Sequence, residues 1–196
     1  MTDQDRWVAD HGDVTHKVTF PLGPDSVVLD VGGYYGDWSM EICAHYNPYI
    51  HIFEPLPEFY EWIKKRFSWN PKVSVYNFGL SDRSFQAQLT HRHSATSLYL
   101  PGDDPCTAEI KDVAEIWNFP AVDLMSINVE GEEYKIISRL LSTGIIHKVK
   151  DLQVQFHCIG DSQNWNLLRK EIRNRLQNTH SENYCYEFVW ESWRKQ

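Results

Sequence analysis

The sequence predicts a Rossmann-like α/β fold with a mostly parallel central sheet and helices on both faces. Short apolar runs alternate along the chain with segments whose apolar residues recur at helical spacing. Such alternation is typical of βαβ units, whose strands run parallel. The chain has 196 residues and no linker or repeat, which favours one domain with a sizeable core. We therefore expect a single domain over 1–196, of which 1–26 precede the first strand.

The first half of the predicted sheet comes from three apolar runs. The first strand is V-V-L-D-V at 27–31, and the helix after it, 39–46, ends before Asn47 and Pro48. The second strand is Y-I-H-I-F-E at 49–54. Apolar residues at helical spacing follow from Pro57 to Phe67, where proline suits the first turn of a helix. The third strand is expected at 73–78.

The second half continues the pattern after an extra hairpin, expected from 85–90 and 97–100. The remaining predicted elements follow in chain order. They are a helix at 112–117, a fourth strand at 121–129, a helix marked by Tyr134, Ile137 and Leu141, a fifth strand at 152–157, a helix marked by Trp165, Leu168 and Ile172, and a closing strand at 184–190. Ligands of such sheets bind beyond the carboxyl ends of the strands, so the residues after each strand carry the functional argument.

Composition restricts the class of partner. Acidic residues number 27 and basic residues 19, giving a net charge of −8, which argues against general binding to nucleic acid or to an anionic membrane. No run approaches the ~20 apolar residues of a membrane span, and the first residues lack the apolar core of a signal peptide. None of the four cysteines forms a C-x-x-C pair, so we expect free thiols, no zinc site and a cytoplasmic protein.

A glycine-rich turn follows the first strand, in D-V-G-G-Y-Y-G-D-W-S at 30–39. Its glycines allow a sharp turn and close approach of a ligand, and the next helix offers free N–H groups. The dinucleotide pattern G-x-G-x-x-G needs glycine where Tyr34 and Asp37 stand, or where Tyr35 and Trp38 stand. The spacing matches D-x-G-x-x-x-G, the usual loop of Rossmann-like methyltransferases, although a plain turn without a ligand is an alternative.

Three further strand ends add candidate binding residues. Glu54 ends the second strand, 54 − 36 = 18 residues after the last glycine. An acid at this position can accept hydrogen bonds from both ribose hydroxyls. The alternative is a carboxylate that only begins the next helix. In F-G-L-S-D at 78–82, Asp82 or backbone groups would meet the adenine amino group, or the segment is a capped turn.

The fourth strand ends in S-I-N-V-E-G-E-E at 126–133. Asn128 and Glu130 alternate and are expected on the same side, with Asn128 able to reach the methionine part or the acceptor. Glu132 and Glu133 are expected to begin the next helix, where negative charge is favoured.

Together these segments resemble one family. V-L-D-V-G-G-Y-Y-G-D-W-S, I-F-E-P-L-P, G-L-S-D and V-D-L-M-S-I-N-V-E-G-E-E, followed by Q-V-Q-F-H, resemble the FkbM family of S-adenosylmethionine-dependent methyltransferases. These segments span residues 28–133, and Q-V-Q-F-H extends the likeness to His157. The resemblance implies a class I methyltransferase fold. It also implies S-adenosyl-L-methionine as methyl donor, S-adenosyl-L-homocysteine as product, and O-methylation of sugars, polyketides and similar hydroxylated compounds. The cofactor-binding residues expected from the motifs and the resemblance are Asp30, Gly32, Gly33, Tyr34, Tyr35, Gly36, Glu54, Pro55, Gly79, Leu80, Ser81, Asp82 and Asn128.

The chain departs from the family at three positions. Ser126 and Asn128 stand where relatives usually have lysine and aspartate, and Tyr34 stands where a small polar residue is frequent. An amide cannot act as a base as a carboxylate can, so a catalytic role of the relatives' aspartate would not carry over to Asn128.

A sugar hydroxyl benefits from a base during methyl transfer. His157, at the end of the fifth strand, has a suitable pKa, and the predicted catalytic residues are His157, Glu130 and Asn128. The alternative for His157 is a structural histidine; His91 and His93 are further candidates that a solvated hairpin also explains. A divalent metal that acidifies neighbouring hydroxyls is another route, but the acidic residues form no distinctive pattern, so no metal site is assigned.

We therefore expect an O-methyltransferase that modifies a hydroxyl of a sugar or glycan, with little room for a lid before the first strand. A non-catalytic adenosylmethionine-binding or partner module, an enzyme acting on a polyketide-like small molecule and an NAD-dependent enzyme are the alternatives. No nucleic-acid or membrane partner is expected, and the sequence leaves the oligomeric state open.

Overall fold

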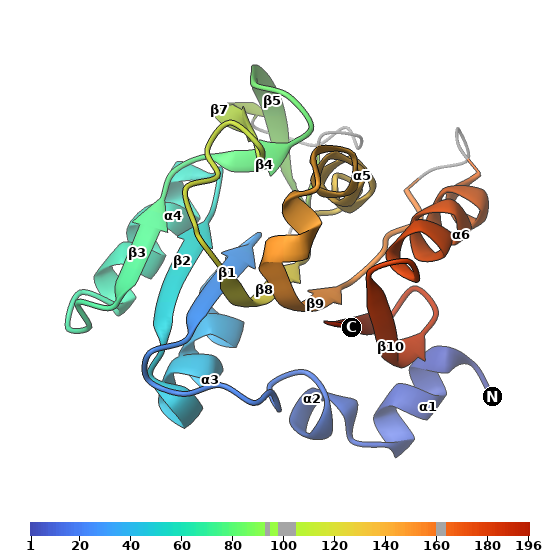
Figure 1. Cartoon of the computed structure of the whole chain (residues 1–196). Helices are drawn as coiled ribbons and strands as arrows, with labels where there is room; N and C mark the ends of the chain where they lie inside the picture. The colour runs from blue at the N-terminus through green and yellow to red at the C-terminus, as the bar shows by residue number, and fades with distance from the viewer. Residues whose placement is uncertain (93–94, 98–104, 160–163) are drawn as a thin grey trace.

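The protein is described here by a computed structural model, which covers residues 1–92, 95–97, 105–159 and 164–196. Its main sheet has seven strands in the order β10-β11-β9-β8-β1-β2-β3 (Figure 1). Only β11 runs antiparallel to its neighbours, which confirms the mostly parallel sheet. The strands are β1 (Val27–Val31), β2 (Tyr49–Phe53), β3 (Val73–Tyr76), β8 (Val122–Ile127), β9 (Val149–Val154), β10 (His180–Tyr186) and β11 (Trp190–Lys195).

Helices cover both faces of this sheet, as the fold class requires. The helices α3 (Asp37–Tyr46) and α4 (Pro57–Arg66) pack on one face, and α5 (Glu133–Thr143) and α6 (Trp165–Leu176) pack on the other, with the 3-10 turn η1 (Ile145–Lys148) leading into β9. Side chains of β1 alternate between the two layers: Val28 contributes to the α3–α4 core, and Leu29 to the α5–α6 core. Because both faces of the sheet are covered, the central strand β1, V-V-L-D-V, is apolar at all positions but Asp30.

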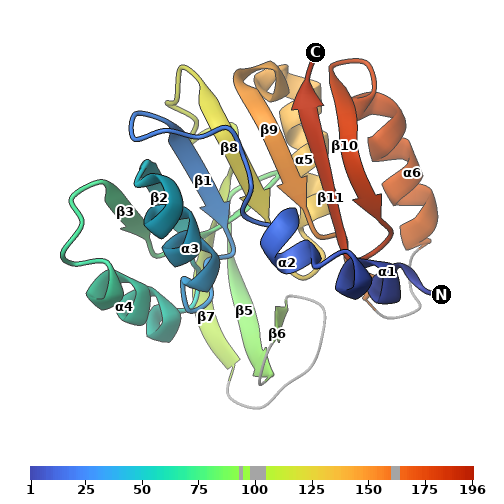
Figure 2. The same ribbon diagram turned by 90° about the horizontal axis from the view of Figure 1, so that it is seen from below.

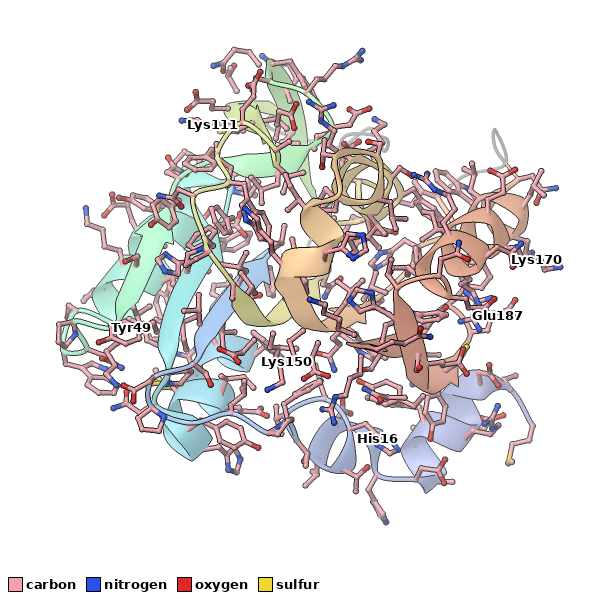
Figure 3. All side chains as sticks on the ribbon, viewed as in Figure 1. His16, Tyr49, Lys111, Lys150, Lys170 and Glu187 are labelled. Atoms are coloured by element: carbon pink, nitrogen blue, oxygen red, sulfur yellow. The ribbon has the colours of Figure 1, made fainter. Side chains whose placement is uncertain are left out.

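The first 26 residues contain two short helices, α1 (Asp3–Ala9) and α2 (Gly12–Thr15). They lie on the α3 side of the sheet, across β11 and β10 (Figure 2). Trp7 packs against Tyr186 and Trp190, and His16, labelled in Figure 3, lies with its ring centroid 4.8 Å from that of Tyr184. Residues 1–26 therefore cover the part of the sheet formed by β10 and β11.

A second sheet lies beyond the carboxyl ends of the central strands (Figure 2). Its strands, in the order β4-β7-β5-β6, are β4 (Gly79–Ser81), β5 (Phe85–Arg92), β6 (Ala95–Ser97) and β7 (Pro105–Asp112). The predicted strand at 85–90 is confirmed as part of β5, and it pairs briefly with β6, but its long partner is β7. Residues 98–100 of the predicted hairpin lie outside the described residues.

The predicted helix at 112–117 is wrong. Residues Pro105–Asp112 form a strand, and a turn follows it, in which the Ala114 N–H donates to Asp112 Oδ1 at 2.8 Å. Asp112 therefore ends the strand β7, in which Ala108 and Ile110 face the same apolar cluster, and its side chain accepts from the turn that follows.

Other boundaries also differ from the prediction. The closing strand expected at 184–190 is a hairpin, β10 and β11, whose turn holds Phe188 in the left-handed region at φ 56°. The turn contains no glycine or proline, so it lacks the usual sequence signal. The third strand ends at Tyr76 rather than at residue 78, the fourth ends at Ile127 rather than at 129, and the fifth runs from Val149 to Val154 rather than over 152–157. Among the described residues, no helix is long and apolar enough to cross a membrane.

Candidate active site

A pocket opens where β1, β2 and β8 end, and the second sheet forms its far side. It encloses about 780 Å³ of space, counting the part open to solvent. Eight sequence-predicted residues line it together with residues that the sequence did not single out. The lining is Val31, Gly32, Tyr34, Phe53, Glu54, Pro55, Gly79, Leu80, Leu89, Ile110, Asn128, Val129, Glu130 and Glu132.

The glycine turn brings backbone against backbone. Gly32 adopts φ 91°, and a Cβ atom there would lie 2.0 Å from the carbonyl oxygen of Asn128. At Gly33 a Cβ atom would lie 2.3 Å from Ile52 Cγ2. Side chains at these two positions are therefore excluded by the strand ends beneath them. The result is a turn with open space on its pocket side, and Gly36 then begins α3 as its N-cap.

Tyr34 departs from the small residue frequent in relatives, and its surroundings explain how the chain accommodates it. The residue adopts φ 50°, a left-handed conformation unusual for a bulky side chain. Its ring packs against Tyr35 and Phe59, with centroid distances of 4.5 and 4.7 Å. The aromatic contacts hold the turn in place while the Tyr34 N–H donates to Glu54.

Glu54 is held at the pocket wall by main-chain donors. It is 4% exposed; its Oε2 accepts the Tyr34 N–H at 2.8 Å, and its Oε1 accepts the Leu56 N–H at 2.9 Å. Burial raises the pKa of Glu54 to about 7, against the opposing effect of these two donors. A carboxylate has about four acceptor positions, so both oxygens can still accept a hydroxyl. This geometry fits a ribose.

Asp30 lies beneath the turn rather than on the pocket wall. It is buried, and its Oδ2 accepts the Ser39 hydroxyl at 2.5 Å. Burial raises the pKa of Asp30 to about 7, and its charge adds slightly to the raised pKa of Glu54. The two carboxyls thus titrate as neighbours under the same turn. Gly33, Tyr35 and Gly36 also lie outside the pocket lining.

The end of the pocket predicted for adenine is apolar. Gly79 and Leu80 face Leu89 and Ile110 of the second sheet. Ser81 and Asp82 do not line the pocket: the Ser81 hydroxyl is buried and donates to Glu132 Oε2, and Asp82 borders a separate groove between α5 and α6. Glu132 is the N-cap residue of α5 and lines the pocket. Its Oε1 accepts a hydrogen bond from Lys135 Nζ at 2.7 Å.

Where the loop after β8 lines the pocket, an imidazole lies between two carboxylates. His157 Nε2 lies 3.4 Å from Glu130 Oε1, and His157 Nδ1 lies 3.3 Å from Glu133 Oε1. Glu130 lines the pocket, whereas His157 lies behind it with 15% of its side chain exposed. The structure thus brings the predicted pair together, with Glu130 facing the pocket. Asn128, the third predicted catalytic residue, lies on the wall just beyond β8.

The two carboxylates change the titration of this pair. Burial alone lowers the pKa of His157, but Glu133 and Glu130 outweigh it and leave the pKa above its ordinary value. Burial raises the pKa of Glu130, Glu133 raises it further, and His157 opposes the shift. Glu130 and Gly131 both have positive φ, 51° and 114°. For Glu130 this is a strained conformation, of the kind often found at functional sites.

Several contributors escaped the sequence prediction. Leu89 and Ile110 belong to strands that pair across the second sheet, and Glu133 was expected only to begin a helix, which it does as the first residue of α5. No local signal links Glu133 to His157. His91 lies in β5, and His93 lies outside the described residues. Within the described ranges, no group of three or more His, Cys, Asp or Glu side chains is arranged to hold a metal ion.

Comparisons with known proteins agree with this geometry. The family model of the methyltransferase FkbM domain matches residues 30–183. Among solved structures, a candidate rRNA methylase from Clostridium thermocellum has a TM-score of 0.61 at 11% identity, covering 96% of this chain and 94% of its own. An rRNA methylase from Streptococcus thermophilus has a TM-score of 0.52 at 8% identity, covering 89% of each chain.

A third structure, the fibrillarin pre-rRNA processing protein of Methanococcus jannaschii, has a TM-score of 0.52 at 10% identity and covers 90% of this chain and 69% of its own. At these identities the likeness shows the fold, which is that of class I methyltransferases. No curated protein matches the sequence. The match over most of the chain shows that this protein belongs to the FkbM family of S-adenosylmethionine-dependent methyltransferases.

Proposed function

We propose that the protein transfers the methyl group of S-adenosylmethionine to a hydroxyl of a sugar or glycan. The observation that carries the proposal is the Glu130–His157 pair, in which Glu130 lines the same pocket as Gly32, Glu54 and Asn128. A hydroxyl is a weak nucleophile and gains from a base in its transition state. A base at this pocket is what such an acceptor needs.

In this proposal the adenine lies against Leu80, Leu89 and Ile110, and the ribose hydroxyls donate to Glu54. The methionine end then points toward Asn128 and Glu130, so the sulfonium lies near a carboxyl group. The acceptor oxygen attacks the methyl carbon, the carbon–sulfur bond breaks with its electrons left on sulfur, and the hydroxyl proton passes to the Glu130–His157 pair. The products are a methyl ether and S-adenosylhomocysteine.

Charge favours this acceptor class over RNA. The chain carries a net charge of −8, whereas RNA binding draws most of its affinity from basic residues that neutralise phosphates. The methylases named for rRNA share the fold with this chain at 8–11% identity, which carries no information on substrate. Support for a sugar comes from the family resemblance.

The test is transfer of radiolabelled methyl groups to three panels: glycans, hydroxylated small molecules of polyketide type, and structured RNA. We expect label in a glycan, stable to mild base as an ether is, and its loss in the Glu130→Gln variant. Label found only in the small-molecule panel or only in RNA would overturn the assignment to a glycan.

A non-catalytic adenosylmethionine-binding module is the second candidate, and Asn128 is the observation that favours it. The residue lies on the pocket wall where relatives usually have an aspartate. If it is correct, the chain binds S-adenosylhomocysteine but transfers no methyl group to any panel, and Asn128→Asp gives turnover. Turnover by the unchanged chain would exclude this candidate.

A further inference from the structure

Glu133 makes more contacts than a helix-starting acid requires. Its side chain is fully buried. Its Oε2 accepts the Gly131 N–H at 2.8 Å, and its Oε1 accepts the His157 N–H at 2.6 Å. The same Oε1 lies 3.3 Å from His157 Nδ1. One carboxylate therefore ties the strained loop after β8 to both the backbone and the ring of His157.

These contacts favour Nδ1 as the nitrogen that carries the proton in the neutral ring. Both oxygens of Glu133 accept from main-chain N–H groups, so the group acts as an acceptor toward His157 Nδ1, and Nδ1 must be the donor. A neutral imidazole has one N–H, which leaves the Nε2 lone pair directed at Glu130, the residue of the two that lines the pocket. The Tyr134 hydroxyl donates to the His157 carbonyl at 2.9 Å and holds the residue from a second direction.

We propose that Glu133 is the positioning residue of this site: it holds His157 in the Nδ1–H tautomer, so that Nε2 and Glu130 together take up the proton of the acceptor. The proposal rests on the proposed function of the Glu130–His157 pair. In the transfer step, one proton moves from the hydroxyl to the position between Nε2 and Glu130 Oε1, and Glu133 neither gains nor loses one. A carboxylate that orients a catalytic imidazole in this way serves the same purpose in hydrolases.

A merely structural role makes different predictions. Glu133 is the first residue of α5, where a negative charge stabilises a helix. If that were its only role, its loss would lower stability but leave the His157 tautomer and the pH profile unchanged. The ring is faced by Glu130 from the loop after β8 and by Glu133 from α5. Since both raise the pKa of His157, removing one charge must lower that pKa.

The first measurement needs no variant and no acceptor. Nitrogen-15 NMR of His157 in the wild-type chain, at a pH where the ring is neutral, is expected to show a protonated Nδ1 and an unprotonated Nε2. The opposite tautomer in the wild-type chain would overturn the proposal. Because this reading does not depend on turnover, it separates the role of Glu133 from the proposed methyl transfer.

The second measurement uses Glu133→Gln, Glu133→Asp and a matched control. Asp151→Asn makes the same carboxylate-to-amide change at a buried group in β9 that pairs with Arg194 and does not line the pocket. For Glu133→Gln we expect kcat to fall by about 10²-fold or more, its acid limb to move to lower pH, and S-adenosylhomocysteine affinity to change by less than about threefold. Glu133→Asp, which keeps the charge, is expected to recover part of the rate.

A Glu133→Gln variant with the wild-type pH profile and the rate of Asp151→Asn would contradict the proposal. If Glu133→Gln does not fold, the rate and pH profile of Glu133→Asp and the His157 tautomer in the wild-type chain still test the positioning role of Glu133. If the tautomer is as expected but no panel is methylated, the proposed function fails and the positioning role of Glu133 stands.

Discussion

The part of the pocket predicted for the cofactor and the part around Glu130 and His157 are built in different ways. In the part predicted for the cofactor, most contacts involve the main chain. Gly32 has no side chain, which lets the turn approach the Asn128 carbonyl, and Glu54 accepts from the Tyr34 and Leu56 N–H groups. In the other part, the contacts join side chains from three separate segments. Glu130, Glu133 and His157 meet there only because β8, α5 and β9 are packed together.

In the proposed function, this difference corresponds to the one between cofactor binding and the transfer step. A wall built from backbone tolerates few substitutions, because a Cβ atom at Gly32 or Gly33 would clash with its neighbours. A wall built from side chains is adjustable one residue at a time. Asn128, on the pocket wall, stands where the family resemblance implies an aspartate. Substitutions in the two parts should therefore affect different measured quantities.

The largest effect is expected in the part around Glu130 and His157. Glu130→Ala and His157→Ala should each reduce kcat by about 10²–10⁴-fold, because a general base contributes that much. The affinity for S-adenosylhomocysteine, measured by titration calorimetry, should change little. Equal losses of turnover and cofactor affinity would show that the two parts are not separate.

The next effect is expected at the turn. Gly32→Ala should lower the free energy of unfolding by roughly 1–3 kcal/mol through backbone strain alone, and by more because its Cβ would lie 2.0 Å from the Asn128 oxygen. Gly144→Ala is the matched control, since Gly144 also has positive φ, 74°, but no atom lies within 4 Å of a Cβ there. Urea denaturation of both variants isolates the clash; identical losses would contradict the role given to Gly32.

A smaller effect is expected at Glu54. Glu54→Ala should weaken binding of S-adenosylhomocysteine by roughly 1–3 kcal/mol, through lost charge-assisted hydrogen bonds. Calorimetry measures this directly, and Asp123→Ala, a carboxylate outside the pocket lining, serves as control. Unchanged affinity would remove Glu54 from the ribose role.

The smallest effect is a pH dependence of the same binding. Hydroxyl donors favour the carboxylate form of Glu54, whose pKa is raised to about 7 in the free protein. Below that pH a proton must leave when the ligand binds, so affinity should fall by up to about tenfold per pH unit below 7 and level off above it. Glu54→Gln should flatten the curve. A wild-type affinity that is constant between pH 6 and pH 8 would contradict this account.

The same contrast explains how much the sequence could predict. The order of strands and helices in the main sheet follows from local apolar patterns, and the turn and Glu54 follow from spacing along the chain. The second sheet was misread because β7 pairs with both β5 and β4 across long stretches, and such pairing has no local pattern. The turn at Phe188 was missed because it contains no glycine or proline.

Side-chain constellations are harder to predict for the same physical reason. Glu130 and His157 could be named separately as candidates, since each follows a strand. Their contact, and the contact of His157 with Glu133 from 24 positions earlier in the chain, depend on the packing of α5 against the sheet. No spacing rule records that packing.

A crystal structure of the complex with S-adenosylhomocysteine tests the central claim most directly. We predict that the ribose hydroxyls donate to Glu54, that the adenine lies against Leu80, Leu89 and Ile110, and that the sulfur points toward Glu130. A ligand bound elsewhere, or bound in the pocket with its sulfur directed away from Glu130, would contradict the division of the pocket into a cofactor part and a catalytic part.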